Sequence, residues 1–441
     1  MRKILFILIA FCLINCSKND DNPAEVSPQI EFTKTFGGSK NESAQSVIQT
    51  TDGGYAVLGF TQSKDGDVLT NESLDYYDYW LLKFDINNDL QWSNLYGGSI
   101  SEKAYDIAQT QDGGFILIGS SNSTDRDVTS NEGLNDFWVV KTDNSGIIEW
   151  EKSYGFSGND LGYSVTQTSD GGYFVGGTLD VSASNGEGND RTYSRHAGGD
   201  YWGLKLDSSG NKEWRRYFGG TFTDTVYDVI ESNEGGFLLV GSSDSEDVDI
   251  SNNKGSYDFW IVKVNSQGEL VWEKSFGGSE IDEARSICKT NDGNYLIVGD
   301  SRSNDKDISN SKGAADIWLI KISESGNLIW EKSFGGSSFD AGRHISPTLD
   351  NGFIITGSSR SQDFNLETNF GQNDIWVFKI NASGDMQWQK SFGGTDIDIA
   401  YSAVELNDES IIIVGETSSS DNDITENKGF TDLLITKIKL Q

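Results

Sequence analysis

The chain has 441 residues, with 68 acidic against 34 basic side chains and a formal net charge of −34. Such a charge disfavours nucleic acids and anionic lipid surfaces as partners, since both are polyanions. Two histidines and three cysteines provide no metal-binding His/Cys cluster, and the sequence contains neither a serine nucleophile elbow nor a phosphate-binding loop. Composition therefore disfavours the common classes of enzyme.

Residues 1–15 have the pattern of a signal peptide. The basic start Met1-Arg2-Lys3 precedes an apolar run that is too short to span a bilayer as a helix. The run ends at Leu13-Ile14-Asn15-Cys16, which resembles a bacterial lipoprotein cleavage box. The resemblance implies cleavage before Cys16 and attachment of lipid to this residue, which anchors the protein stably when more than one acyl chain is present. The alternative is an ordinary signal peptide with an incidental cysteine.

Residues 16–28 are polar and lack a hydrophobic pattern, so we expect a flexible acidic tether. Its acidic cluster resembles the surface-export signal of Bacteroidota lipoproteins. This implies an outer-membrane lipoprotein that faces outward, with a periplasmic orientation as the alternative. Since Cys12 leaves with the signal and Cys16 carries lipid, Cys288 has no disulfide partner, and we expect it to be a small packed side chain.

A cassette of about 58 residues occurs seven times in the remaining chain. Each copy carries four β-strand signals, which in the second copy fall at residues 104–110, 115–119, 136–141 and 147–154. Glycine-containing turns separate them, and no helical period occurs, so the fold class is all-β. The cassette is marked by an aromatic-Gly-Gly step that begins at Phe36, Tyr96, Tyr154, Phe218, Phe276, Phe334 and Phe392.

Seven four-stranded units predict a seven-bladed β-propeller over residues 29–441. An open β-solenoid is the competing architecture, and the two ends of the chain argue against it. Residues 29–36 copy a fourth strand, whereas residues 432–440 copy a third strand. We therefore expect the N-terminal strand to complete the last blade and close the ring, which removes exposed sheet edges.

The Phe-Gly-Gly step, the Asp-Gly-Gly turn and the Asp-aromatic-Trp strand resemble the bacterial β-propeller repeats (SBBP-like repeats) of Bacteroidota secreted proteins and lipoproteins. The resemblance covers residues 29–441. It implies the fold and the location, because that family has no single activity.

All twelve tryptophans occupy two positions of the cassette, and we expect them to pack between blades rather than to bind a ligand. Six lie in third strands and six in fourth strands: Trp80, Trp138, Trp202, Trp260, Trp318 and Trp376, and Trp92, Trp150, Trp214, Trp272, Trp330 and Trp388.

Three polar positions also recur in every cassette. We expect the lysines to pair with the acids and to tie neighbouring blades together, because a desolvated lysine needs a carboxylate partner. The alternative is a ring of acids at the channel mouth. The positions are the acid after the Gly-Gly step (Glu42, Glu102, Asp160, Asp224, Asp282, Asp340, Asp398), the acid opening the third strand (Asp78, Asp136, Asp200, Asp258, Asp316, Asp374, Asp432) and a third-strand lysine (Lys83, Lys141, Lys205, Lys263, Lys321, Lys379, Lys437).

The loop between the second and third strands carries an Asp-x-Asp pattern in six cassettes. Hard oxygen donors at alternating positions suit Ca²⁺, although the spacing is not that of an EF-hand. The alternative is that Asp and Asn fold the loop by bonding backbone amides. The candidate calcium ligands are Asp65, Asp67, Asn71, Asp125, Asp127, Asn131, Asp247, Asp249, Asn253, Asp305, Asp307, Asp421, Asp423 and Asn427.

The third cassette departs from this pattern with six extra residues. Its loop concentrates basic residues and one of the two histidines in a strongly acidic chain, which makes it a candidate for a specific contact on the face where propellers usually bind ligands. Drift in a tolerant surface loop is the alternative. The candidate ligand-binding residues are Glu187, Asp190, Arg191, Tyr193, Arg195 and His196.

These features predict a membrane-anchored binding or scaffolding module for a protein or a glycan, with calcium as the only candidate cofactor. The alternative function is a carboxylate-dependent glycosidase or lyase that uses the acidic face.

Overall fold

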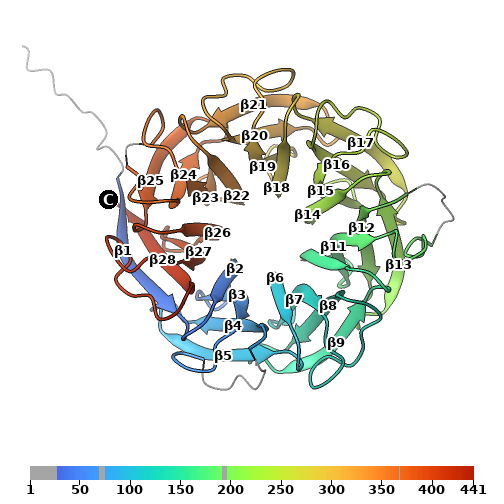
Figure 1. Cartoon of the computed structure of the whole chain (residues 1–441), viewed down its shortest axis with the longest axis horizontal. Helices are drawn as coiled ribbons and strands as arrows, with labels where there is room; N and C mark the ends of the chain where they lie inside the picture. Colours follow the sequence, from blue (N-terminus) through green and yellow to red (C-terminus); the bar gives the residue numbers. More distant parts are fainter. Residues whose placement is uncertain (1–26, 69–74, 191–195, 367) are drawn as a thin grey trace, which may run out of the picture.

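The computed structural model describes residues 27–68, 75–190, 196–366 and 368–441, and all regular structure among them is β-strand. Seven four-stranded antiparallel sheets stand around a central axis as the blades of a propeller (Figure 1). The predicted fold is therefore confirmed.

Blades one to three contain, from axis to rim, β2 (Glu42–Gln49), β3 (Tyr55–Thr61), β4 (Asp78–Phe84) and β5 (Leu90–Tyr96); β6 (Glu102–Gln109), β7 (Phe115–Ser121), β8 (Asp136–Thr142) and β9 (Ile148–Tyr154); β10 (Leu161–Gln167), β11 (Tyr173–Asp180), β12 (Gly199–Leu206) and β13 (Lys212–Phe218). Blades four and five contain β14 (Asp224–Glu231), β15 (Phe237–Ser243), β16 (Asp258–Val264) and β17 (Leu270–Phe276); β18 (Asp282–Lys289), β19 (Tyr295–Ser301), β20 (Asp316–Ile322) and β21 (Leu328–Phe334). Blades six and seven contain β22 (Asp340–Pro347), β23 (Phe353–Ser359), β24 (Asp374–Ile380) and β25 (Met386–Phe392); β26 (Asp398–Glu405), β27 (Ile411–Thr417), β28 (Asp432–Leu440) and β1 (Pro28–Phe36).

The ring closes between the two ends of the chain, as predicted. Strand β1 pairs antiparallel with β28 along its length, from Pro28 opposite Leu440 to Phe36 opposite Leu433. The strand begins at Pro28, one residue before the predicted domain boundary. In Figure 1 the blue β1 lies at the rim beside the red β28. Closure thus leaves no blade without its outer strand.

We use the name top face for the side that carries the loops between consecutive blades and the loops between second and third strands. The bottom face carries the other hairpin turns. Each innermost strand runs from the top face to the bottom face, because the inter-blade loop precedes it and the Asp-Gly-Gly turn follows it.

The third-strand tryptophans form the contacts between blades, as predicted. All six have at most 1% of their surface exposed. Trp260 of blade four, for example, packs in one apolar cluster with Phe174 and Tyr201 of blade three. Its ring centroid lies 4.5 Å from that of Tyr201. The fourth-strand tryptophans are half-buried except Trp388, which is buried.

The third-strand lysines are buried and paired, but the predicted partners were wrong. Lys83 bonds to Asp52 at 2.9 Å and Lys321 to Asp292 at 2.7 Å. These acids belong to the bottom turn of the same blade, so the pair does not join two blades. The reason is that the lysine lies at the bottom end of its strand, whereas both recurrent acids lie at the top. In blade four Glu234 replaces the turn aspartate, and Lys263 bonds instead to Glu324 of the next blade.

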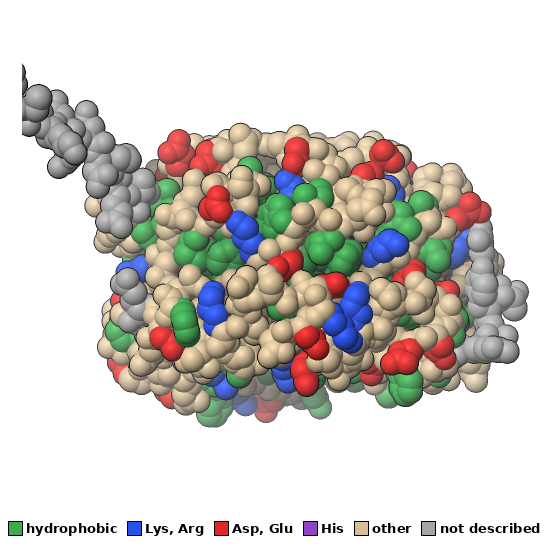
Figure 2. Space-filling model, turned by 90° about the horizontal axis from the view of Figure 1, so that it is seen from above, with side chains coloured by type: hydrophobic (Ala, Val, Ile, Leu, Met, Phe, Trp, Pro, Cys, Tyr) green, Lys and Arg blue, Asp and Glu red, His purple; other side chains and the backbone are tan. Residues whose placement is uncertain are grey.

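The side of the ring displayed in Figure 2 carries acidic, basic and apolar side chains in mixture. Among the described side chains in that view, neither sign of charge forms a continuous patch. None of the described segments is a helix long and apolar enough to cross a membrane.

Candidate functional site

The two recurrent acids meet at every blade junction, around the first glycine of the aromatic-Gly-Gly step. At the junction of blades four and five, a Cβ placed on Gly277 would lie 2.3 Å from Oδ1 of Asp258 and 2.7 Å from Oδ2 of Asp282. The two oxygens are therefore no farther apart than the sum of these distances. Oδ2 of Asp282 accepts the amide hydrogen of Gly278 at 2.6 Å, and Oδ2 of Asp258 accepts that of Lys254 at 2.6 Å. The acids thus belong to the junctions and do not line the channel.

These buried carboxyls hold protons more tightly than exposed ones. Burial, reinforced by the facing acid, raises the pKa of Asp258 to about 7 and that of Asp224 to about 8. One oxygen of the third-strand acid has no hydrogen-bond donor in most described junctions. We infer that a proton held by one of the two facing carboxyls gives this oxygen a partner. The acids with such an oxygen include Asp136, Asp200, Asp258, Asp316, Asp374 and Asp432.

Replacing Gly277 by alanine should lower the free energy of unfolding by about 1–3 kcal/mol, because the new methyl group collides with both carboxyls of the junction. Chemical denaturation measures the change. Ser279→Ala in the same exposed loop is the matched control, since the Ser279 amide is what bonds to Asp305. If Gly277→Ala changed the free energy of unfolding as little as Ser279→Ala does, this account of the junction would be contradicted.

The Asp-x-Asp loops bind the inter-blade loops. The first acid accepts an amide hydrogen two residues after the first glycine, as Asp305 does from Ser279 at 2.8 Å. The second acid accepts the amide hydrogen of that glycine, as Asp307 does from Gly277 at 3.2 Å. The residue between the acids is left-handed, with φ of 56° at Lys306. The same contacts are made by Asp65, Asp67, Asp125, Asp127, Asp247, Asp249, Asp421 and Asp423.

The predicted asparagine ligands also bond to backbone groups. Asn131 accepts the amide hydrogen of Gly133 at 2.8 Å and donates to the carbonyl of Ser121 at 2.7 Å. Asn253 and Asn427 make equivalent contacts, and Asn71 lies outside the described residues. No group of three or more His, Cys, Asp or Glu side chains in the described ranges is arranged to hold a metal ion. The geometry supports loop folding, and calcium stays a prediction.

Removal of calcium should leave the thermal midpoint unchanged, because backbone amides already occupy the loop carboxylates. The measurement is a melt after chelation and dialysis, with elemental analysis of the protein. Stoichiometric calcium together with a higher midpoint on its return would instead establish the ion interpretation.

The loop of blade three is held against the outermost strand β13. Asp190 lies 3.4 Å from Nζ of Lys212 and 3.4 Å from Nε of Arg215. The carbonyl of Gly188 accepts the indole hydrogen of Trp202 at 2.8 Å. Glu187 is exposed, whereas Arg191, Tyr193 and Arg195 lie outside the described residues. The described part of the insertion therefore packs toward the rim, and its role in binding stays a prediction.

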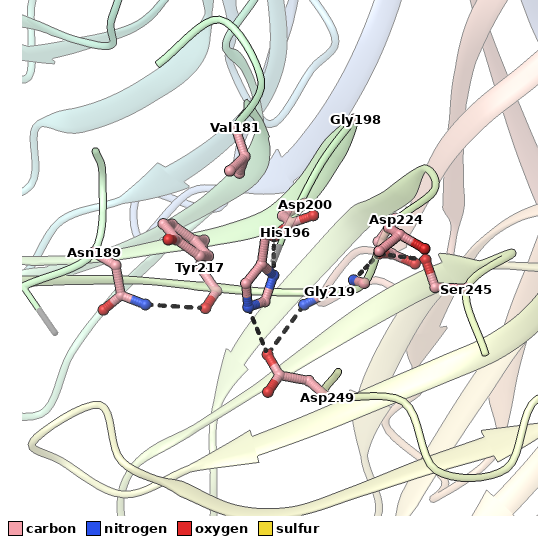
Figure 3. A network of polar contacts seen from close by, with 12 residues as sticks. Val181, Asn189, His196, Gly198, Asp200, Tyr217, Gly219, Asp224, Ser245 and Asp249 are labelled. Atoms are coloured by element: carbon pink, nitrogen blue, oxygen red, sulfur yellow. Dashed lines mark hydrogen bonds and ion pairs between the residues drawn. The ribbon is translucent and has the colours of Figure 1, made fainter. Parts of the chain in front are cut away.

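His196 lies in a polar network between blades three and four (Figure 3). Its Nδ1 is 2.6 Å from Asp200 and its Nε2 is 3.8 Å from Asp249, and its side chain is 2% exposed. Burial opposes protonation, but the hydrogen bond to Asp200 and the nearby acids outweigh it and raise the pKa of His196. Blades four, five and seven place a lysine at this position, where Lys254 binds Asp307 of the next blade at 3.0 Å. His196 thus fills a position that joins blades.

The central channel contains a cavity of about 260 Å³ lined by two consecutive residues from each innermost strand. We call the first of the two residues the ring and the second the belt. Strand alternation would send consecutive residues to opposite faces, but every innermost strand has a β-bulge here, which lets both line the cavity. The ring is Gln45, Tyr105, Tyr163, Tyr227, Arg285, Arg343 and Tyr401, and the belt is Ser46, Asp106, Ser164, Asp228, Ser286, His344 and Ser402.

The belt side chains of blades one to five are linked by hydrogen bonds, and the belt forms the floor of the cavity. Asp106 lies 3.0 Å from the hydroxyl of Ser46 and 3.1 Å from that of Ser164, and Asp228 lies 2.9 Å from the hydroxyl of Ser164 and 3.0 Å from that of Ser286. Burial and the charge of Asp228 raise the pKa of Asp106 to about 7. The residues after the belt line a second cavity of about 640 Å³, so the belt separates it from the one on the top-face side.

The ring was missed by the sequence analysis, although the sequence contains its signal. Its members all stand three residues after the recurrent acid that begins the innermost strand, from Gln45 after Glu42 to Tyr401 after Asp398. At this position the cassettes carry large side chains of three kinds, Tyr in four blades, Arg in two and Gln in one. The β-bulge, which directs them to the axis, has no marker in the sequence.

The comparisons with known proteins concern the fold. No family model matches the chain. The regulatory protein FlaEY of Caulobacter vibrioides is 24% identical over 169 residues, which are 36% of this chain and only 18% of that protein. A protein of unknown function from Dyadobacter fermentans is 13% identical with a TM-score of 0.49, covering 94% of this chain and all of its own. The WD40 domain of Pan2 from Neurospora crassa is 9% identical with a TM-score of 0.49, covering 93% and 95%. No functional conclusion rests on these similarities.

Proposed function

We propose that this protein is a membrane-anchored binding module that holds a small ligand, or one residue of a glycan or protein chain, in the ring. The supporting observation is the distribution of variation among the blades. The recurrent acids, lysines and tryptophans build the propeller, whereas the ring position, which is Tyr in four blades, Arg in two and Gln in one, lines a cavity. Convergent polar and aromatic groups around a concave site are typical of ligand binding.

Binding is a better proposal than hydrolysis, although the belt contains two carboxyls. Catalytic carboxyls must reach the substrate. Each oxygen of Asp106 and Asp228 instead accepts a backbone amide hydrogen and lies within hydrogen-bond distance of a serine hydroxyl. These contacts hold both carboxyls within the floor.

Anchoring through lipid on Cys16 and outward display on the outer membrane belong to the same proposal. They rest on the signal-like residues 1–15 and the acidic tether. Cys16→Ser should release the protein from the membrane fraction, and a protease added to intact cells should digest the wild type. Membrane retention of the variant would contradict the lipid anchor.

A panel of monosaccharides, oligosaccharides, nucleosides and aromatic acids tests the binding site. Thermal shift and titration calorimetry should find compounds that stabilise the wild-type protein and not Tyr163→Ala. Tyr163 is suitable because its ring lies 5.0 Å from that of Tyr105 and 5.5 Å from that of Tyr227.

The control for the competing site is R191A/Y193A/R195A. Deletion of the whole loop is unsuitable, since it removes the carbonyl of Gly188 that bonds to Trp202. The proposal predicts that this triple variant keeps the binding that Tyr163→Ala loses. The reverse pattern would place the site in blade three and refute the ring.

A further inference from the structure

Two arginines stand side by side in the ring and are the basis of the inference. Arg285 belongs to blade five and Arg343 to blade six. Arg285 bonds to Glu283 of its own strand at 2.9 Å. Within the described part of the chain, the guanidinium of Arg343 makes no hydrogen bond or ion pair, and Nε of both arginines is buried without an acceptor. A partly buried cation of this kind gains most from an anionic partner.

The rest of the ring presents aromatic faces. Tyr105, Tyr163 and Tyr227 form a continuous arc over blades two to four. The Cζ atom of Arg285 lies 4.1 Å from the ring centroid of Tyr227, and Tyr401 follows Arg343 on the other side. Aromatic faces pack against flat rings, while a guanidinium fork matches the oxygens of a carboxylate or phosphate.

The belt below contains one hydrogen too few for its contacts. Four oxygen–oxygen contacts join Ser46, Asp106, Ser164, Asp228 and Ser286 in a row. The three serine hydroxyls supply three hydrogens. The hydroxyl of Ser164 lies between both carboxyls and can donate to only one of them. A proton on Asp106 or Asp228 completes the row and removes one negative charge from the floor of the cavity.

We propose that the ring residues of the cavity bind an anionic group carried on a small cyclic molecule, such as a uronic acid or a sugar phosphate. Binding is linked to a proton held between Asp106 and Asp228. The proposal rests on the proposed function and names its ligand class. Arg343 and Arg285 bind the carboxylate or phosphate of the ligand, and the tyrosines pack against its sugar ring. The cavity of about 260 Å³ suits one ring with its substituents.

The other groups around the belt keep their charge between pH 6 and 8. Burial lowers the pKa of His344 to about 4, so this residue is neutral. Burial raises the pKa of Tyr105, Tyr163 and Tyr401. The arginines stay charged, and Ser286 and Ser402 do not titrate in this range. Burial also raises the pKa of Asp300, a buried acid of β19 that interacts with Arg285 and Arg343, so the belt proton must be separated from it by Asp106→Asn. An anion above the belt favours the protonated state of Asp106 and Asp228.

The experiment is titration calorimetry of the purified protein with four probes: glucuronate, glucose 6-phosphate, glucose and acetate. We expect the two ring anions to bind at pH 6, and glucose and acetate to bind at least tenfold more weakly. Arg343→Gln should weaken the binding of glucuronate and glucose 6-phosphate by about ten- to a hundredfold. The control is Arg360→Gln, because Arg360 is exposed and lies outside the cavity. This variant should bind both anions as tightly as the wild type. Raising the pH from 6 to 8 should weaken the binding of glucuronate, whose charge is constant in this range, by up to about tenfold per unit, and Asp106→Asn should remove this dependence.

Each outcome decides one part. Equal binding of glucose and glucuronate overturns the anionic ligand class and leaves the proposed function intact. If acetate binds as tightly as glucuronate, the proposed role of the tyrosines is wrong. A third outcome is that none of the four probes binds, while a compound of the larger panel binds the wild type and not Tyr163→Ala. This outcome also refutes the ligand class alone. Binding that does not change with pH, in the wild type as in Asp106→Asn, overturns the linked proton.

Discussion

Replacing Trp260 by alanine is expected to lower the free energy of unfolding by about 3–5 kcal/mol. The indole is fully buried between blades three and four and donates to Glu273 at 3.0 Å, while its backbone carbonyl accepts the hydroxyl of Tyr201 at 2.9 Å. Alanine removes this contact area and leaves a cavity that rigid strands on both sides cannot fill. Chemical denaturation of the purified protein measures the change.

The matched control is Trp214→Ala in the outermost strand of blade three. Its indole is half-buried and donates to the carbonyl of Ser266 at 2.9 Å. We expect a clearly smaller loss there, because less surface is withdrawn from water. Equal losses at the two positions, or little loss at Trp260, would show that the third-strand tryptophans do not hold the blades together.

The second large effect is a fall in stability as the pH rises from 5 to 8. In the folded protein the junction carboxyls have a raised pKa, about 6 for Asp136 and Asp374, about 7 for Asp258 and about 8 for Asp224. A carboxyl with a raised pKa contributes stability below its unfolded pKa, and this contribution is lost as the pH rises through the folded value. Each pKa unit corresponds to about 1.4 kcal/mol per group.

The turn acids act in the opposite direction and fix the lower limit of this range. Hydrogen bonds and the neighbouring lysine outweigh burial and lower the pKa of Asp112 and Asp292 to about 2, so their contribution is lost only in stronger acid. We therefore expect maximum stability near pH 5, measured by denaturation across the pH range. Asp258→Asn should stabilise the protein at pH 8 but not at pH 5, since an amide donates to Asp282 without a proton. Stability that rises from pH 5 to 8 would contradict the shared protons.

The architecture could be predicted because it depends on residues that recur. Four strand signals in seven copies and the offset between residues 29–36 and 432–440 determine the number of blades and the closure. The packing of the third-strand tryptophans follows for the same reason. Recurrence does not reveal which acid lies near a lysine, because the cassette of Lys83 contains both the turn acid Asp52 and the strand acid Asp78. Only the strand direction places Lys83 beside Asp52 at the bottom turn.

The candidate site could not be predicted in the same way, because binding depends on what differs. The insertion of blade three is a conspicuous difference in sequence, yet Asp190 and His196 contact β13 and the next blade. At the ring the cassettes differ from one another only by substitution at one position. Its location at the axis depends on the β-bulge and on closure of all seven blades, and neither is visible in a single cassette.

The most direct test of the ring as the binding site is ¹⁹F NMR of the protein labelled with 3-fluorotyrosine. Tyr→Phe variants at positions 105, 163, 227, 401 and 193 assign the relevant resonances. On titration with the tightest-binding compound of the panel, we predict that the four ring resonances shift together and that of Tyr193 does not. A shift of Tyr193 without a change at the four ring positions would contradict the account and place the ligand on the loop of blade three.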